Sequence, residues 1–260
     1  SLKAILGLFT ESQRLHLVNI RDVSGSTILH WSAYHPEAIG VILNQWPESQ
    51  LLRAISTCDN NGRTVLHYAV LSGHIESVRI ILRLCPESLR PQLVNTQDRD
   101  GETILHIAAR VGSLKVIRTI MEQLPESERL RALCMKDNNE RNVLHWAIRG
   151  YTPIPSGDPR LVKFILTVLP ESQRLSVVTL PDVKGRTALH EAARSRKSGS
   201  IYCILDLLPE SQRVQAVNVR DRKGNTASQL ASEATRESIM TLLPPLEKDS
   251  NRTHELNGDT

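Results

Sequence analysis

The sequence predicts an all-α repeat solenoid, because one short pattern recurs along nearly the whole chain at a regular distance. The clearest copy is TILHIAA at Thr103–Ala109. The other copies are Thr27–Ala33, Thr64–Val70, Asn142–Ile148, Thr187–Ala193 and a degraded Thr226–Ser232. An aspartate stands five residues before each copy, and these aspartates are 37, 39, 39, 45 and 39 residues apart. Self-similarity at a period of this size is typical of stacked supersecondary units.

The full pattern, DxxGxTxLHxAA, resembles the ankyrin repeat from residue 1 to about residue 245. An ankyrin unit has about 33 residues, so this unit is longer by about six. The additional residues contain a second motif, PESQR or a close variant, at Glu11–Arg14, Pro47–Gln50, Pro86–Ser88, Pro125–Arg129, Pro170–Arg174 and Pro209–Arg213. This long variant resembles the ankyrin arrays of effectors that intracellular bacterial pathogens inject into host cells.

The spacing predicts one elongated domain in three parts. Residues 1–21 are expected to be a truncated repeat, with a second helix at Leu2–Phe9 and a short third helix. Residues 22–246 hold six repeats, of which the last is a polar C-terminal cap, as a solenoid requires. Residues 247–260 are polar and aperiodic, which predicts disorder. The missing first helix and the initial Ser1 indicate an excised piece of a longer protein with further repeats or domains; the alternative is a makeshift N-terminal cap.

Each repeat follows physically from its pattern. The DxxG segment predicts a turn, because aspartate can bond its own backbone and glycine accepts a positive φ. The threonine that follows fits a helix N-cap, and the next leucine and alanine face one buried side of the first helix. Glu140 stands where the fourth repeat should have its glycine. The turn of that repeat is therefore expected to be distorted.

The PESQR motif predicts a third, short helix in each repeat. The second helix has an apolar helical period and stops at the proline. The proline fits the first position of a new helix, and the glutamate behind it suits the helix dipole. Apolar residues five and eight positions after the proline, such as Leu130 and Leu133, lie on one face. Pro91 falls within this segment in the second repeat, so the third helix should be poorer there.

The repeated histidines indicate structure rather than catalysis. Five of the nine occupy the LH position, at His30, His67, His106, His145 and His190. Packed helix layers keep them about 10 Å apart, which is too far for a shared metal ion. The ankyrin resemblance implies instead that each imidazole bonds the threonine hydroxyl and the adjoining turn. The PESQR glutamates also recur in one environment, whereas catalytic acids and bases need distinct environments.

Motifs and composition disfavour several classes of protein. The sequence contains no nucleophile elbow, phosphate loop or HExxH motif, so we expect a non-enzymatic protein without a metal or cofactor. The four cysteines lack CxxC spacing, which favours reduced thiols. No apolar run approaches the roughly 18 residues of a membrane helix, so membrane insertion is not expected.

The informative positions are the two residues between the turn aspartate and glycine and the one after the glycine. Of these 18 positions 7 are basic, against about 2 expected from 32 basic residues in 260. They are Arg63, Arg99, Arg141, Lys184, Arg186, Arg222 and Lys223. Arg110, Arg149 and Arg194, at the ends of first helices, extend the stripe. In ankyrin proteins turns and first helices line the concave face, so the stripe predicts a groove for an acidic ligand in repeats three to six.

These observations favour a protein–protein interaction scaffold that binds an acidic protein segment. Lysine and arginine suit carboxylate or phosphate recognition. The alternatives are a nucleic-acid-binding module, which the pI near 9.0 favours but the 3% aromatic content disfavours, the interaction module of a larger enzyme, and a merely solvated basic edge. A cytoplasmic location is expected, in the host cytoplasm for a secreted effector, where reduced thiols are stable.

The segment Gly150–Pro159 produces the 45-residue step and is expected to be a loop between two helices. Loops that depart from a strict repeat often carry function. Tyr151 and Ile154 are candidate apolar anchors in it for a partner. The alternative is a neutral spacer, since loop length adds closure entropy slowly.

Overall fold

The computed structural model describes residues 8–44, 47–150 and 158–243, and these residues form helices joined by turns, with no strand. The predicted all-α class is confirmed. The first helices of the six repeats are α3 (Ile28–Ser32), α6 (Val65–Leu71), α9 (Ile104–Arg110), α12 (Val143–Arg149), α15 (Ala188–Arg194) and α18 (Ala227–Leu230). The second helices are α4 (Pro36–Leu43), α7 (Ile75–Leu84), α10 (Leu114–Gln123), α13 (Pro159–Thr167), α16 (Ser198–Asp206) and α19 (Glu233–Met240).

A third helix follows the proline in the first five repeats. These helices are α5 (Glu48–Ile55), α8 (Arg90–Val94), α11 (Glu126–Cys134), α14 (Glu171–Val178) and α17 (Glu210–Asn218), and α2 (Glu11–Asn19) precedes the first repeat in the same way. The prolines occupy the N-cap with ψ from 141° to 149°, one position before the expected first helical position. In the second repeat a 3-10 turn (Glu87–Leu89) and the five-residue α8 replace one longer helix, which confirms the expected effect of Pro91.

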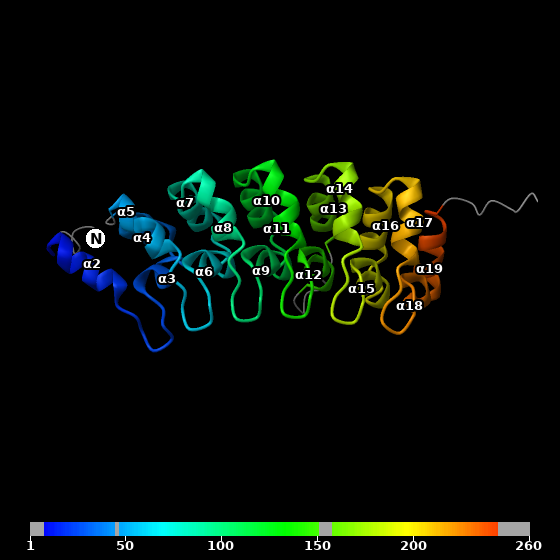
Figure 1. Cartoon of the computed structure of the whole chain (residues 1–260), viewed down its shortest axis with the longest axis horizontal. Helices are drawn as coiled ribbons and strands as arrows, with labels where there is room; N and C mark the ends of the chain where they lie inside the picture. Colours follow the sequence, from blue (N-terminus) through cyan, green and yellow to red (C-terminus); the bar gives the residue numbers. More distant parts are fainter. Residues whose placement is uncertain (1–7, 45–46, 151–157, 244–260) are drawn as a thin grey trace, which may run out of the picture.

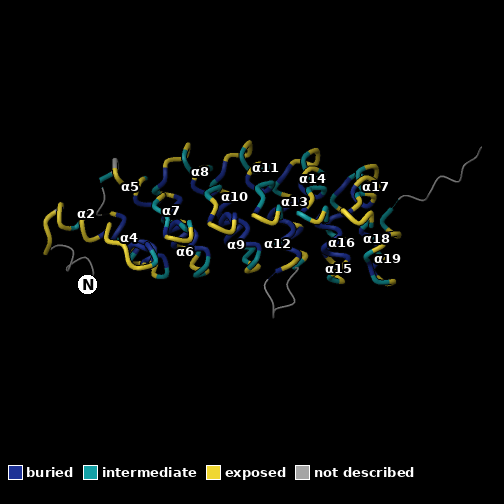
Figure 2. Tube along the Cα trace, turned by 60° about the horizontal axis from the view of Figure 1, so that its bottom comes forward, coloured by how far each residue is buried: buried dark blue, intermediate teal, exposed yellow. Residues whose placement is uncertain are grey.

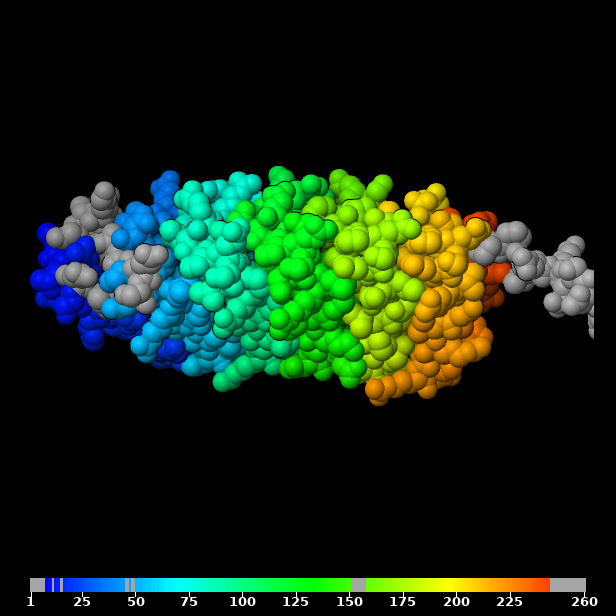
Figure 3. Space-filling view, turned by 45° about the horizontal axis from the view of Figure 1, so that its top comes forward, coloured from blue at the N-terminus to red at the C-terminus, as the bar shows by residue number. Residues whose placement is uncertain are grey.

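The repeats stack in one row in sequence order, and helices of the same kind contact each other. The helix α9 packs against α6 and α12, and α10 packs against α7 and α13. Figure 1 shows the turns side by side along one long edge, and Figure 3 shows the repeats as successive bands. The motif leucines, such as Leu66, Leu105 and Leu144, are fully buried between layers. Buried residues form one core along the row, as the dark blue trace in Figure 2 shows.

The turns are held by the motif aspartate and bonded to one another. In the third repeat Asp98 Oδ1 accepts the amides of Asp100 and Glu102 at 3.0 and 2.9 Å. The Arg99 amide donates at 2.8 Å to the Asn61 carbonyl of the preceding turn. Equivalent bonds join the remaining neighbouring turns, so the turn edge is a continuous backbone ladder. Successive turns therefore hold their side chains in a fixed register.

The expected distortion at Glu140 is wrong. Its backbone takes a φ of 58°, and its amide donates to the Asp137 carbonyl at 2.8 Å, as the glycine amides do in other turns. Asp137 Oδ1 also accepts the Asn139 and Arg141 amides at 2.8 Å each. A non-glycine residue costs about 1–2 kcal/mol in this left-handed region. The surrounding hydrogen bonds offset that cost and keep the turn regular.

Gly101 allows two turns to approach closely, and replacing it with alanine tests this contact. A Cβ on Gly101 would lie 2.6 Å from the Asn138 amide nitrogen, at a φ of 75°. Gly112 has nearly the same φ, 72°, but a Cβ there would have no atom within 4 Å. Gly112→Ala should lower the free energy of unfolding by about 1 kcal/mol, and Gly101→Ala by about 1–3 kcal/mol more. Equal losses in urea titrations of the two variants would contradict the close approach.

The arginine of PESQR closes the end of the second helix, a role that the sequence did not reveal. Arg129 Nε donates to the Met121 and Leu124 carbonyls at 3.2 and 3.3 Å. Arg90 and Arg174 make the same pair of bonds, and Arg213 makes one of them. The last carbonyls of a helix lack intrahelical donors. The third helix therefore folds back so that its own arginine can supply them.

We predict that Arg129→Ala lowers the free energy of unfolding by about 1.5–3 kcal/mol, because two carbonyls at the end of the second helix lose their charged hydrogen-bond donor. Arg131, two residues further along α11, is the matched control. Its side chain is 73% exposed, with only a 4.0 Å contact to Glu128, so Arg131→Ala should cost about 0–0.5 kcal/mol. Chemical denaturation of both variants measures the difference. Similar losses would show that Arg129 adds only helix propensity.

Several sequence expectations concern residues outside the described ranges. They are the loop residues 151–157 with Tyr151 and Ile154, most of the helix expected at Leu2–Phe9, and the tail 247–260. On either side of the loop, Gly150 ends α12 with a φ of 60°, and Asp158 caps α13. Among the described helices, none is long and apolar enough to cross a membrane.

Candidate functional site

The five motif histidines cap their own helices, as the resemblance implied, and all but His67 also bond the next repeat. The Thr103 amide donates to His106 Nδ1 at 3.1 Å, and the Thr103 hydroxyl lies 2.8 Å from the same nitrogen. Because Nδ1 accepts, the ring proton is on Nε2. Nε2 then donates to the Met135 and Arg141 carbonyls of the next repeat at 3.0 and 3.1 Å. His30, His145 and His190 also bond carbonyls of the following turn.

The histidines are neutral in the folded protein. Burial lowers the pKa of all five, and that of His67 to about 4. Protonation would also place a hydrogen on Nδ1, where it would oppose the amide of the capping threonine, or of Asn142 in the fourth repeat. Among the described residues, no group of three or more histidine, cysteine, aspartate or glutamate side chains could hold a metal ion. The imidazoles therefore serve the fold: each caps its own helix through Nδ1, and four of them also bond the next repeat through Nε2, whereas Nε2 of His67 is buried without a partner.

These lowered pKa values predict a loss of stability on acidification. Well above pH 6.5 the imidazoles are neutral in both the folded and the unfolded chain. Below pH 6.5 the unfolded chain binds protons at these imidazoles and the folded chain does not, so the free energy of unfolding falls toward pH 4. His67 accounts for about 3 kcal/mol of this loss. His67→Gln should reduce the loss between pH 7 and 4.5 by about 2 kcal/mol, as measured by urea unfolding.

Glutamine is the matched replacement because this chain already uses it at the same place. Gln13 and Gln229 accept the amides of Thr10 and Thr226 at 2.9 and 2.8 Å. The cap should therefore survive in His67→Gln while the titratable ring is removed. Equal losses of stability in the wild type and the variant would contradict the assignment to His67.

The residue after each histidine forms a row over the turns that sequence reasoning did not single out. These residues are Trp31, Tyr68, Ile107, Trp146 and Glu191, with Leu230 after Gln229 at the same place in the sixth repeat. Trp31 Nε1, the Tyr68 hydroxyl and Trp146 Nε1 donate to Oδ2 of their own turn aspartates at 2.9, 2.9 and 3.0 Å. The available signal was that the position after LH is aromatic in three repeats. These rings make the row chemically different from one repeat to the next.

Two of the predicted basic residues of repeats two to four have close acidic partners. Arg63 lies 3.3 Å from Asp98, and Arg110 lies 3.0 Å from Glu102. Arg110 and Arg141 lie over the Trp146 ring, at 5.9 and 5.3 Å from its centroid. Arg63, Arg110 and Arg149 line a hollow of about 470 Å³ with Asp100, Glu102, Trp146 and Gly150. This part of the predicted stripe thus mixes both charges around one indole.

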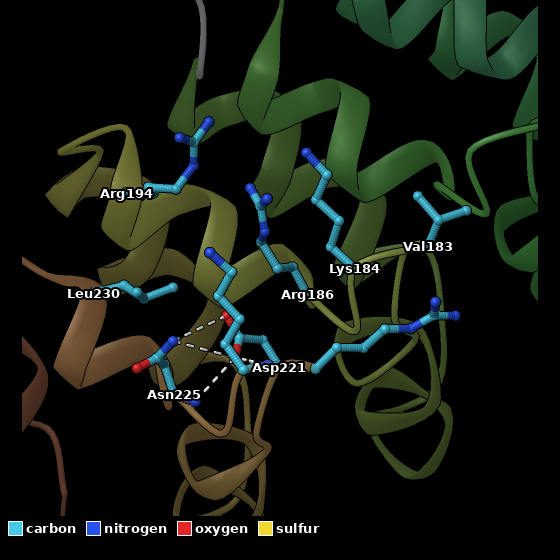
Figure 4. A pocket seen from close by; sticks show the side chains of 9 residues that line it. Val183, Lys184, Arg186, Arg194, Asp221, Asn225 and Leu230 are labelled. Carbon is cyan, nitrogen blue, oxygen red and sulfur yellow. Dashed lines mark hydrogen bonds between the residues drawn. The ribbon is translucent and has the colours of Figure 1, made fainter.

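The basic residues of repeats five and six gather in a second hollow of about 530 Å³. It is lined by Val183, Lys184, Arg186, Arg194, Asp221, Arg222, Lys223, Asn225 and Leu230. Figure 4 shows the Lys184, Arg186 and Arg194 side chains extending in the same direction. The Arg222 amide donates to the Lys184 carbonyl at 2.9 Å, which brings the two turns together. We call this the basic hollow.

One buried carboxylate lies beside the basic hollow. Glu191 is 7% exposed and lies 3.9 Å from each of Arg149, Arg186 and Arg194. For Lys184, Arg222 and Lys223 the described part of the chain contains no ion-pair partner, and all three are exposed. Five of the predicted site residues therefore meet in one place with little compensation.

The remaining predicted residues lie elsewhere. Arg99 is exposed on the third turn and lines neither hollow, and Tyr151 is outside the described residues. At the other end of the row, Trp31, Tyr34 and Tyr68 form a ring cluster with centroids 6.0–6.3 Å apart. Trp31 is 52% exposed there. The face of turns and first helices is thus aromatic in the first two repeats and basic in the last two.

Comparisons with known proteins agree with this architecture. A model of three ankyrin repeats matches residues 3–89, and a single-repeat model matches residues 100–124. The crystal structure of the ankyrin repeat domain of Bcl-3, described as a unique member of the IkappaB protein family, is similar in fold with a TM-score of 0.68. It is 15% identical, and the match covers 92% of this chain and 91% of that chain. No curated protein sequence matches significantly.

The chain therefore contains ankyrin repeats and folds as an ankyrin-repeat solenoid. Ankyrin repeats are generally protein–protein interaction modules, and the fold is typically non-enzymatic.

Proposed function

We propose that this protein is a non-enzymatic scaffold that binds an acidic segment of a partner protein along its turns and first helices. By resemblance to other ankyrin proteins this is the concave face. The observation that carries the proposal is the basic hollow, where Lys184, Arg222 and Lys223 stand without ion-pair partners among the described residues. Uncompensated cations on neighbouring turns attract an anionic chain and raise its association rate.

The rigidity of the turns supports the same proposal. Two hydrogen bonds hold the backbone of Arg186. Its amide donates to Asp182 Oδ1 at 2.9 Å, and its carbonyl accepts from His145 Nε2 at 2.9 Å. A preorganised surface loses less entropy on binding. Nucleic acid is the weaker candidate, since none of the described residues that line the basic hollow is aromatic and could stack on a base.

We further propose that the protein works in a reducing cytoplasm, as an effector in the host cytoplasm on the resemblance of its long repeats. Burial raises the pKa of Cys58, Cys85, Cys134 and Cys203 above the usual thiol value. Protonated thiols are slow to oxidise. They suit a compartment in which free cysteines persist.

The binding proposal predicts that the triple variant Arg186→Glu, Arg222→Glu and Lys223→Glu captures at least about tenfold less partner from host-cell lysate, because three attractive contacts become repulsive. Quantitative mass spectrometry of the captured proteins measures the effect. Arg79→Glu, Arg83→Glu and Arg131→Glu form the matched control, since these exposed arginines lie on second and third helices and produce the same charge change. If the triple variant in the basic hollow captured as much partner as the wild type, or if it and the control variant lost equal amounts, the partner would not bind at the basic hollow.

A further inference from the structure

We propose that the basic hollow recognises a phosphorylated segment of the partner, with phosphate groups as the anions that Lys184, Arg186, Arg194, Arg222 and Lys223 hold. This inference rests on the proposed function and specifies the chemistry of its ligand. It follows from the balance of charge in the hollow, from the size of the hollow and from the donor geometry.

The charge in the hollow exceeds what its own acids supply. Within the described ranges, five cations line it, and Asp221 is the one carboxylate among the lining residues. Oδ1 of Asp221 already accepts the Lys223 and Asn225 amides at 2.9 Å each. Glu191 stands beside the hollow and shares its charge with Arg149 as well. Five cations against two carboxylates leave an excess of about three positive charges.

The size of the hollow limits how many carboxylates can enter. A volume of about 530 Å³ corresponds to a width of about 8 Å. An extended segment rises about 3.4 Å per residue and turns alternate side chains to one face. Only one or two residues can therefore direct their side chains into the hollow, and as glutamate or aspartate they bring at most two charges. Phosphorylated residues carry about 1.5–2 charges each, so two of them balance the excess.

The donor geometry also favours phosphate. Planar guanidinium groups bind phosphate oxygens bidentately, and lysine adds a point charge. Repeat five presents Lys184, Arg186 and Arg194, whose side chains extend in the same direction in Figure 4, and the Arg222 amide bonds the Lys184 carbonyl, which holds the turn of repeat six beside them. Val183 and Leu230 add aliphatic surface to the lining. A peptide can use such surface, whereas a free inorganic ion cannot.

The test measures binding by fluorescence anisotropy at physiological salt, with the 260-residue chain and fluorescein-labelled peptides of glycine and alanine. The probe carries two phosphoserines separated by one residue, and its controls carry two glutamates or two serines there. We expect the phosphopeptide to bind at least about tenfold more tightly than the glutamate peptide. Lys184→Ala with Lys223→Ala should weaken phosphopeptide binding at least about tenfold, whereas Arg79→Ala with Arg131→Ala should leave it unchanged.

A gain-of-affinity variant removes misfolding as an explanation. Glu191→Gln keeps the shape of the side chain and deletes the anion that lies 3.9 Å from Arg186 and Arg194. It should tighten phosphopeptide binding about threefold or more. Weaker binding in a variant with an unchanged melting temperature would contradict the role given to this carboxylate.

The outcomes separate this inference from the proposed function. Equal affinity for the glutamate peptide and the phosphopeptide, lost in the lysine variant, would overturn the phosphate inference and leave the acidic-segment scaffold standing. No binding of either anionic peptide would overturn both. If inorganic phosphate displaced the phosphopeptide at a concentration equal to the Kd of that peptide, the hollow would be a site for the free ion, and the inference would be overturned. Tighter binding of a single-stranded oligonucleotide of equal charge would do the same in favour of nucleic acid.

Discussion

The stack depends on one neutral imidazole in each of its first five repeats. In the third repeat, His106 accepts the Thr103 amide with Nδ1 and donates to the Arg141 carbonyl of the next turn with Nε2, both at 3.1 Å. One ring therefore caps a helix and joins two repeats, and burial favours the protonation state that does both. The accepting carbonyl belongs to Arg141, whose guanidinium lies over the Trp146 ring on the face of turns and first helices. Cohesion of the solenoid and the register of its binding surface thus rest on the same hydrogen bond.

The parts of the fold that sequence predicts are those decided within one repeat. The turn, the N-cap, the buried leucine and the weak third helix at Pro91 depend on neighbours a few residues away. Arg129 is different, because its acceptors Met121 and Leu124 become available only when the third helix folds back on the second. Glu140 is different too, since bonds from its turn and its neighbours hold a backbone conformation that its residue type disfavours. Tertiary context overrides local preference in both places.

The sequence predicts a continuous stripe of basic residues. In the structure some of these residues pair with carboxylates, whereas others have no such partner among the described residues. Sequence shows where cations stand but not which carboxylate reaches them. Arg63 meets Asp98 of the next turn, and Arg110 meets Glu102 of its own repeat. No comparable partner reaches Lys184 or Lys223 within the described ranges. Pairing of this kind depends on how far side chains reach between turns and helices, and the number of basic residues in the sequence does not show this.

A second difference between repeats comes from one position that the fold leaves free, the residue after the histidine. Where this residue is Trp31, Tyr68 or Trp146, its ring N–H or hydroxyl donates a hydrogen bond to Oδ2 of the turn aspartate. Glu191 cannot donate in that way, and it draws in Arg149, Arg186 and Arg194 instead. The cap, the turn and the buried leucine are the same in each case. A single substitution per repeat therefore changes the chemistry of the face without changing the backbone that presents it, which is how a periodic scaffold acquires a non-periodic binding surface.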